Sequence, residues 1–420
     1  MSLQFITGNS GNGKTKYLFN RIVKEAKANP RDNYLVIVPE QFTMQTQRQL
    51  VDLSENKAIM NIDVLSFKRL AYRVFDELGI TNLTVLEETG KNLVLRKLAA
   101  QEADKLGVIG RNLNRIGYIS EVKSLLSELV QYNISPEELG RYIASGRLSD
   151  TLSDKLKDVL VLYEAFEKFM QDKYITAEEI LNVLSNVAEE SAILRNSVIA
   201  FDEFTGFTPI QNQLIKKLFV ISKKIYVTLT IDCREDIFKS RGMQELFDMP
   251  KRTVKSLTEM AAFYGIEVEE PIILDKNYRL AENEELSFME QQFFRKRRCS
   301  FKKVPKHIHI DCLRDPKQEL TKIARRINEL VRNENLRYRD IAIVTGDVNI
   351  YAGYVREIFD KYNIPYFIDA TQEILFHPFI EFIRSIPDIA AQNFSADAVF
   401  RFLRCGFSEL LDSEIDVLEN

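Results

Sequence analysis

Apolar residues along this chain fall into short runs, and each run is followed by a segment whose apolar positions recur at helical spacing. Runs of four or five apolar residues that alternate with helices are typical of buried strands in a parallel sheet. The sequence therefore predicts an α/β domain built from residues 1–80 together with residues 196–280. The runs that define it are Leu3–Thr7, Tyr34–Val38, Ile62–Leu65, Val198–Phe201 and Ile225–Leu229.

Between these two parts, residues 81–195 show helical periodicity and no convincing strand pattern. Ser135 followed by Pro136, Glu137 and Glu138 is a typical helix start, because a serine cap and acidic residues suit a helix N-terminus. We therefore predict an all-helical domain inserted into the α/β domain. Its helical segments are Glu87–Leu106, Ile116–Gln131, Leu152–Asp172 and Ala177–Glu189.

The α/β pattern returns after residue 280. Residues 281–375 predict a second, partial α/β domain, and residues 376–420 predict the start of a second, truncated helical insertion, so we expect a piece of a longer protein. The basic run Arg295–Lys306 fits a solvated linker better than a contact with DNA phosphates. The predicted strands of this domain are His307–Ile310, Ile341–Val344 and Pro365–Ile368, and its predicted helices are Lys317–Val331 and Ile350–Tyr362.

Composition narrows the class of protein. The 420 residues are 45% hydrophobic and 28% charged, which is typical of a soluble globular protein. The net charge of −4 argues against a chain that binds polyanions over its whole surface. Four scattered cysteines indicate neither a zinc site nor a disulfide framework, so we expect a reducing, cytoplasmic setting. No apolar run approaches the roughly 18 residues needed to span a membrane.

The first candidate for chemistry is a glycine-rich loop that follows the first predicted strand and precedes a predicted helix at Lys16–Ala28. It fits G-x-x-x-x-G-K-[ST], the phosphate-binding loop of P-loop nucleotide hydrolases, in the strand–loop–helix context that this motif requires. Glycines let backbone N–H groups surround a triphosphate, while the lysine neutralises its oxygens and the hydroxyl ligates Mg²⁺. The predicted ATP-binding residues are Gly8, Asn9, Ser10, Gly11, Asn12, Gly13, Lys14 and Thr15.

Such a loop requires an acidic partner at the end of a neighbouring strand. Asp202 and Glu203 follow the apolar run Val198–Phe201 directly. We interpret Asp202 as a ligand of Mg²⁺, with Thr15, and Glu203 as the candidate general base. The fold class predicted from both motifs is a P-loop NTPase of the RecA-like type, interrupted by a helical insertion and followed by a second RecA-like unit.

The order of these motifs resembles superfamily-one helicases of the UvrD/RecB type, and more closely the N-terminal region of the AddB family, over nearly the whole chain. The acidic segment Phe201–Gln211 is similar to the AddB acidic motif, and Val38–Phe42 is similar to its V-P-E-Q signature. Val64–Ala71 is similar to the T-F-H-S segment of motor helicases. Lys276–Arg279 resembles the N-Y-R motif.

The resemblance implies roles for further residues. Arg279 would reach the γ-phosphate and join Lys14, Asp202 and Glu203 as a catalytic residue. The family analogy also makes Gln41, Ser66, Phe67 and Lys68 contacts to single-stranded DNA, although core packing is an equally good interpretation of Phe67. The implied partner is an AddA-like motor and nuclease subunit, in a bacterial helicase–nuclease that processes double-strand breaks for recombination. The family's nuclease residues and iron–sulfur cysteines lie outside this segment, so we expect no such cluster here.

Three departures from active motors are informative. Thr205 and Glu235 stand where motors have glutamines, and Ser240 stands where an aromatic residue would stack on a base. A carboxylate at Glu235 would repel a triphosphate. We therefore expect retained ATP binding with weak or no motor activity. The alternatives are an active superfamily-one helicase and a scaffold for DNA and a partner that is indifferent to nucleotide.

Overall fold

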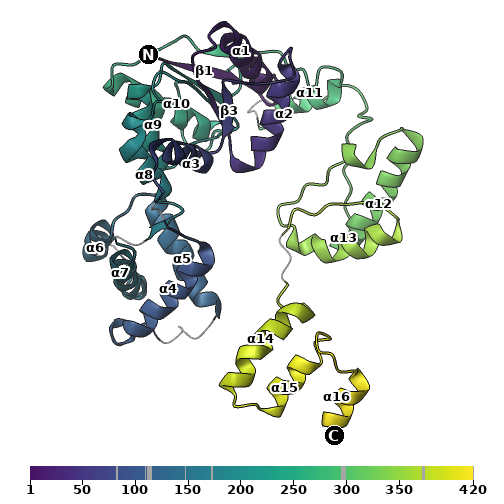
Figure 1. The fold of residues 1–420 in the computed structure, drawn as a ribbon. Helices are drawn as coiled ribbons and strands as arrows, with labels where there is room; N and C mark the ends of the chain where they lie inside the picture. Colours follow the sequence, from purple (N-terminus) through teal and green to yellow (C-terminus); the bar gives the residue numbers. More distant parts are fainter. Residues whose placement is uncertain are drawn as a thin grey trace. The chain divides into compact units, whose positions relative to one another are not determined.

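The computed structural model describes the whole chain except residues 82–83, 109, 111–115, 147, 172–173, 295–298, 371–373 and 420. It divides into two compact units, Met1–His307 and Ile308–Asn420, which are drawn in Figure 1 and described separately below. The first part of the basic run, Arg295–Arg298, lies outside the described residues, whereas Lys302, Lys303 and Lys306 are described and exposed. None of the helices in the described part combines the length and apolar character required to span a bilayer.

A seven-stranded sheet forms the centre of the first unit. Its strand order is β3-β2-β6-β7-β1-β8, with β9 also paired to β1, and every pairing is parallel. The predicted α/β fold with a parallel sheet is therefore confirmed. The strands are β1 (Ser2–Gly8), β2 (Tyr34–Ile37), β3 (Ile62–Leu65), β6 (Val198–Phe201), β7 (Lys224–Thr230), β8 (Glu267–Val268) and β9 (Ile272–Leu274).

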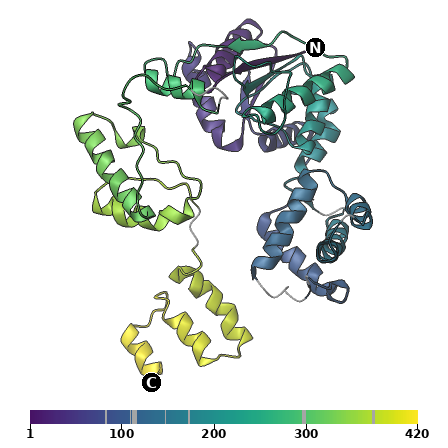
Figure 2. The ribbon, with the colours of Figure 1, turned by 180° about the vertical axis from the view of Figure 1, so that it is seen from behind.

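Both faces of this sheet are covered by helices, as Figures 1 and 2 show from opposite sides. Successive residues of a strand point to opposite faces, so Leu35 packs in one apolar core and Val36 in the other. Helices α1 (Lys14–Ala28) and α2 (Thr43–Leu53) contribute to the core around Val36. The helices on the Leu35 side are α3 (Phe67–Leu78), α8 (Ile180–Val187), α9 (Pro209–Ile221) and α10 (Asp248–Phe263).

The described part of residues 88–170 is mostly helical and has an apolar core of its own, which includes Leu95, Leu126 and Leu162. The prediction that residues 81–195 contain no strand is wrong, because β4 (Val85–Leu86) and β5 (Ile175–Thr176) form a parallel pair. A pair of two-residue strands is too short to produce a periodic pattern in the sequence. The helices are α4 (Glu88–Gln101), α5 (Ile116–Gln131), α6 (Pro136–Ala144) and α7 (Asp150–Met170).

The second unit contains the helices that the sequence predicts but not the strands. The segments His307–Ile310, Ile341–Val344 and Pro365–Ile368 all lie in the described part of the chain, and none is a strand. An extended apolar segment becomes a strand only when a neighbouring backbone completes its hydrogen bonds, and Val344 remains 92% exposed. The prediction of these strands is therefore wrong. The helices are α12 (Pro316–Asn333), α13 (Asn349–Lys361), α14 (Pro378–Ala391), α15 (Ala396–Leu403) and α16 (Asp412–Glu419).

Candidate functional site

A cavity of about 830 Å³ lies in the first unit, at the carboxyl edge of the sheet. Because the strands are parallel, the ends of β1, β6 and β7 meet at this edge, where open α/β sheets bind ligands. Three of the predicted loop residues, Gly8, Asn9 and Asn12, do not line the cavity. The predicted site residues that do line it are Ser10, Gly11, Gly13, Lys14, Thr15, Asp202, Glu203 and Arg279.

The glycine-rich loop precedes α1, so the N-terminus of this helix lies at the cavity. Gly13 precedes the helix with a φ of 79°, a left-handed conformation that glycine adopts without steric cost. The first turn of α1 contains no acidic residue. The free N–H groups at a helix start carry a partial positive charge that attracts anions. The loop geometry therefore suits a phosphate group.

Lys14 lies beside this helix start and points its ammonium group to the loop. Its Nζ donates a hydrogen bond to the carbonyl oxygen of Asn9 at 3.1 Å. Burial lowers the pKa of Lys14, and this effect is opposed by the negative charges of Glu203 and Asp202. The negative charge of a polyphosphate at the loop would stabilise the charged form of Lys14 and so offset the cost of its burial.

Thr15, Asp202 and Glu203 converge in the same cavity. The Thr15 hydroxyl oxygen lies 3.3 Å from Asp202 Oδ1 and 3.3 Å from Glu203 Oε1. Asp202 is 1% exposed, and Thr228 also donates a hydrogen bond to its Oδ1. The other oxygen, Oδ2, is buried and has no hydrogen-bond partner among the described residues.

This arrangement of Asp202 fits a bound cation. Burial raises the pKa of Asp202, because removing a carboxylate from water penalises its charged form. A buried oxygen without a partner normally costs free energy, and a cation would compensate that cost. Carboxylate and hydroxyl oxygens are the hard ligands that Mg²⁺ prefers, so the donor set of Thr15 and Asp202 fits this ion.

Glu203 has an unusual backbone for its residue type. Its φ is +64°, a left-handed conformation that costs a residue with a Cβ about 1–2 kcal/mol. Strain of this kind is concentrated at functional sites. The residue lies at the end of β6, is exposed, and lines the cavity. Its position is therefore compatible with a role as a general base, which must reach a solvent molecule next to the ligand.

Residues 277–279, which follow β9, pack on the glycine-rich loop. The Asn277 side chain donates to the Ser10 carbonyl at 3.0 Å, and the Tyr278 N–H donates to the Gly11 carbonyl at 3.0 Å. Arg279 Nη1 lies 3.3 Å from Ser10 Oγ. Of these three residues, the sequence prediction assigned a role only to Arg279.

Tyr278 also lines the cavity and is 65% exposed. Its ring would lie 3.6 Å from a Cβ placed on Gly13. An exposed aromatic face next to a phosphate loop offers a surface on which a base can stack. The signal that identifies this residue is its position directly before Arg279 in the N-Y-R motif.

The four residues predicted to contact DNA have different environments. Gln41 and Lys68 are exposed, whereas Ser66 is 4% exposed and caps α3 by accepting a hydrogen bond from the Arg69 N–H. Phe67 is 7% exposed and stacks on Phe201 with 5.8 Å between ring centroids. Of the two interpretations of Phe67, the structure favours core packing.

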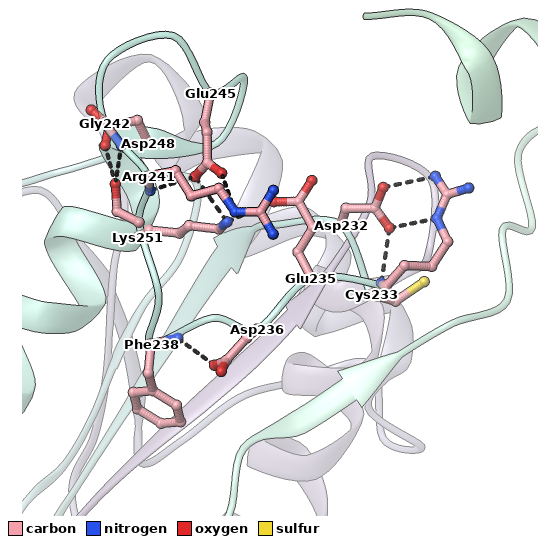
Figure 3. A network of polar contacts seen from close by, with 12 residues as sticks. Asp232, Cys233, Glu235, Asp236, Phe238, Arg241, Gly242, Glu245, Asp248 and Lys251 are labelled. Atoms are coloured by element: carbon pink, nitrogen blue, oxygen red, sulfur yellow. Dashed lines mark hydrogen bonds and ion pairs between the residues drawn. The ribbon is translucent and has the colours of Figure 1, made fainter. Parts of the chain in front are cut away.

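Glu235 belongs to an ion-pair network and is not part of the lining of the cavity. Its carboxylate pairs with Lys251 at 2.7 Å, and this buried lysine also contacts Glu245 at 3.2 Å; Figure 3 shows the network. Glu235 is not among the residues that line the cavity. The expected repulsion of a triphosphate stays a prediction, and its basis is weaker because Glu235 pairs with Lys251 outside the lining of the cavity. Ser240 donates a hydrogen bond to Asp248.

The fold and the cavity define an α/β protein with a candidate ligand site at the carboxyl edge of a parallel sheet. The family model described as "ADDB, N-terminal" matches residues 5–290. The chain therefore belongs to the AddB family, in the N-terminal region that this model covers.

Three curated relatives that match along the whole chain are named as the B subunit of an ATP-dependent helicase/deoxyribonuclease. The relative from Lachnoclostridium phytofermentans is 38% identical, and this chain covers 37% of its length. The relatives from Clostridium tetani and Clostridium acetobutylicum are each 33% identical, with 37% and 36% of their lengths covered. All of this chain is aligned in each case, so it spans little more than a third of these relatives.

Proposed function

We propose that this chain binds ATP and Mg²⁺ in the cavity and that its first unit is a P-loop NTPase domain of the RecA-like type. The proposal is supported above all by the buried Oδ2 of Asp202, which lacks a hydrogen-bond partner among the described residues and lies on the residue that faces Thr15. Lys14 would neutralise the β- and γ-phosphates, Thr15 and Asp202 would hold Mg²⁺, and Arg279 would contact the γ-phosphate. Bound Mg²⁺ supplies electrostatic stabilisation of charge on the phosphate oxygens.

From the name that the relatives share, we also propose the complex and the process in which this chain acts. The chain would be the helicase-like, N-terminal part of the B subunit of a bacterial helicase–nuclease that processes double-strand breaks for recombination. Its partner would be an AddA-like motor and nuclease subunit, and single-stranded DNA would lie near the exposed Gln41 and Lys68. The setting would be the cytoplasm. The nuclease activity would come from parts of the protein outside this segment.

We infer weak or no motor activity, because Thr205 and Ser240 replace the glutamine and the aromatic residue of motor helicases. Two observations favour the second candidate, an active ATPase that DNA stimulates. Glu203 lies beside Thr15. Glu235 pairs with Lys251 outside the lining of the cavity, so its carboxylate would act less on a bound triphosphate.

The first test measures binding of a fluorescent ATP analogue with Mg²⁺ by titration. Lys14→Ala removes a charge-assisted contact worth about 1.5–3 kcal/mol, so affinity falls about ten- to hundredfold. Lys24→Ala, on the exposed face of the same helix, is the matched control and retains wild-type affinity. Undetectable ATP binding by the folded wild-type protein would refute the proposal and favour a scaffold indifferent to nucleotide.

The second test measures steady-state ATP hydrolysis with and without single-stranded DNA. Our proposal predicts slow turnover that DNA changes little. Fast, DNA-stimulated turnover that Glu203→Gln abolishes would instead establish the active motor, since that substitution keeps the shape of the side chain and removes only the base.

A further inference from the structure

Asn9 occupies the first variable position of the phosphate loop, yet its side chain does not line the cavity. We propose that Asn9 is a positioning residue, which holds the loop and Lys14 in the conformation that accepts a polyphosphate. This inference rests on the proposed function, because it concerns the same nucleotide site. It differs from the sequence prediction, in which Asn9 contacts the nucleotide itself.

Both ends of the Asn9 amide are anchored to segments that are distant in sequence. Its Oδ1 accepts a hydrogen bond from the Cys233 N–H at 3.1 Å, and its Nδ2 donates to Glu290 Oε1. Cys233 follows β7, and Glu290 lies in α11 (Glu284–Gln292). Asn9 is only 6% exposed, so solvent cannot readily replace either partner.

The main chain of Asn9 transmits this anchoring to Lys14. Its carbonyl oxygen accepts hydrogen bonds from the Asn12 N–H at 3.1 Å and from Lys14 Nζ at 3.1 Å. The first bond closes the turn of the loop, and the second holds the ammonium group. A side chain fixed at both ends therefore determines where this carbonyl points, and the carbonyl determines the resting position of Lys14.

Removing the amide would leave two polar groups without their partner. In Asn9→Ala, the Cys233 N–H and the Glu290 carboxylate each lose a hydrogen bond, and no replacement group is supplied. The loop would then sample conformations in which its N–H groups no longer converge. Nucleotide affinity would fall although no atom in contact with the ligand has changed, because part of the binding free energy is spent on ordering the loop.

Hydrogen exchange of the amides of residues 8–15, measured without nucleotide, tests the positioning directly. Asn9→Ala and Glu290→Ala are expected to raise this exchange at least about tenfold, which corresponds to about 1.4 kcal/mol. Glu290→Gln retains an acceptor oxygen and is the matched control, with wild-type exchange. The β3 amides, on a strand at the far end of the sheet order, are expected to exchange at the wild-type rate in all variants.

Titration with the fluorescent ATP analogue and Mg²⁺ then shows whether the positioning serves binding. Asn9→Ala should bind about tenfold more weakly than wild type, while Glu290→Gln should bind at least as tightly, since it keeps the contact and removes a negative charge. Unchanged loop exchange in Asn9→Ala overturns the inference. Raised exchange with unaltered affinity also overturns it, because the contact is then only structural. If the wild-type protein binds no ATP, the proposed function fails, and loop exchange alone decides whether Asn9 holds the loop.

Discussion

The close packing of residues 277–279 on the glycine-rich loop can be tested by adding a single methyl group. Gly11 has a φ of +91°, and a Cβ built on it would lie 2.6 Å from Asn277 Oδ1 and 2.8 Å from Arg279 Cβ. Both distances are shorter than real Cβ contacts, so Gly11→Ala must displace the segment that follows β9.

The expected destabilisation has two parts. A positive φ costs alanine about 1–2 kcal/mol relative to glycine. Displacing close-packed neighbours costs about a further 1–3 kcal/mol, and this part includes the hydrogen bond from Asn277 to the Ser10 carbonyl. We therefore expect Gly11→Ala to destabilise the first unit by about 2–5 kcal/mol and to weaken ATP binding.

Gly79 provides the matched control, because its φ is +69° and nothing lies within 4 Å of a Cβ built on it. Gly79→Ala should therefore cost only the conformational part, about 1–2 kcal/mol. Native-state hydrogen exchange of the β1 amides measures the opening free energy of the sheet-containing unit without requiring a two-state transition of the whole chain. If Gly11→Ala and Gly79→Ala lower the opening free energy equally, residues 277–279 do not pack on the loop as described.

Three further predictions concern packing and charge. Phe67→Ala should lower the free energy of unfolding of the first unit by about 3–5 kcal/mol, since it empties a core position. The control Lys68→Ala should change this free energy by no more than about 0.5 kcal/mol. Similar changes for both variants in urea unfolding would contradict the assignment of Phe67 to the core. Lys251→Met should cost about 3 kcal/mol in the same assay, because it leaves two carboxylates without their buried cation. The Arg337 guanidinium lowers the pKa of Asp340 from 3.8 to about 2, so its stabilisation is present above pH 3.8 and is lost as the pH falls through about 2. In Arg337→Ala the midpoint of the carboxyl NMR titration of Asp340 should rise toward 3.8 without reaching it, because the backbone N–H of residue 337 still donates to Asp340 Oδ2. An unshifted midpoint would exclude the guanidinium as the cause.

Five strands of the first unit, β1, β2, β3, β6 and β7, were predictable because burial makes each of these segments apolar; the short strands β4, β5, β8 and β9 were not predicted. A strand buried on both faces must be apolar throughout its length, and Val198–Phe201 satisfies this rule and is β6. The same rule failed in the second unit. Ile341–Val344 is equally apolar, yet it is extended chain without a ladder, because pairing depends on a neighbouring backbone that local sequence does not specify.

The residue types of the candidate site could likewise be predicted from the sequence, whereas their arrangement in space could not. The glycine-rich motif and the acidic pair Asp202–Glu203 could each be read from the sequence, since a phosphate loop requires particular residue types at fixed spacing. Their convergence could not be measured in the sequence, because Thr15 and Asp202 are 187 positions apart. The ion pair of Glu235 could not be predicted from the sequence either, since Lys251 lies sixteen positions further on, in α10.

The sequence by itself determined the parallel α/β architecture, the position of the glycine-rich loop and the types of side chain available near it. These properties depend on burial and backbone preferences that act over a few residues at a time. Only the tertiary structure decided that Asp202 keeps one oxygen without a partner in the described part of the chain, that Phe67 lies in the core, and that Asn9 faces Cys233 and Glu290 rather than the cavity. Hydrogen bonds and ion pairs depend on distance and direction in space, and segments far apart in the chain acquire these only when the sheet has formed.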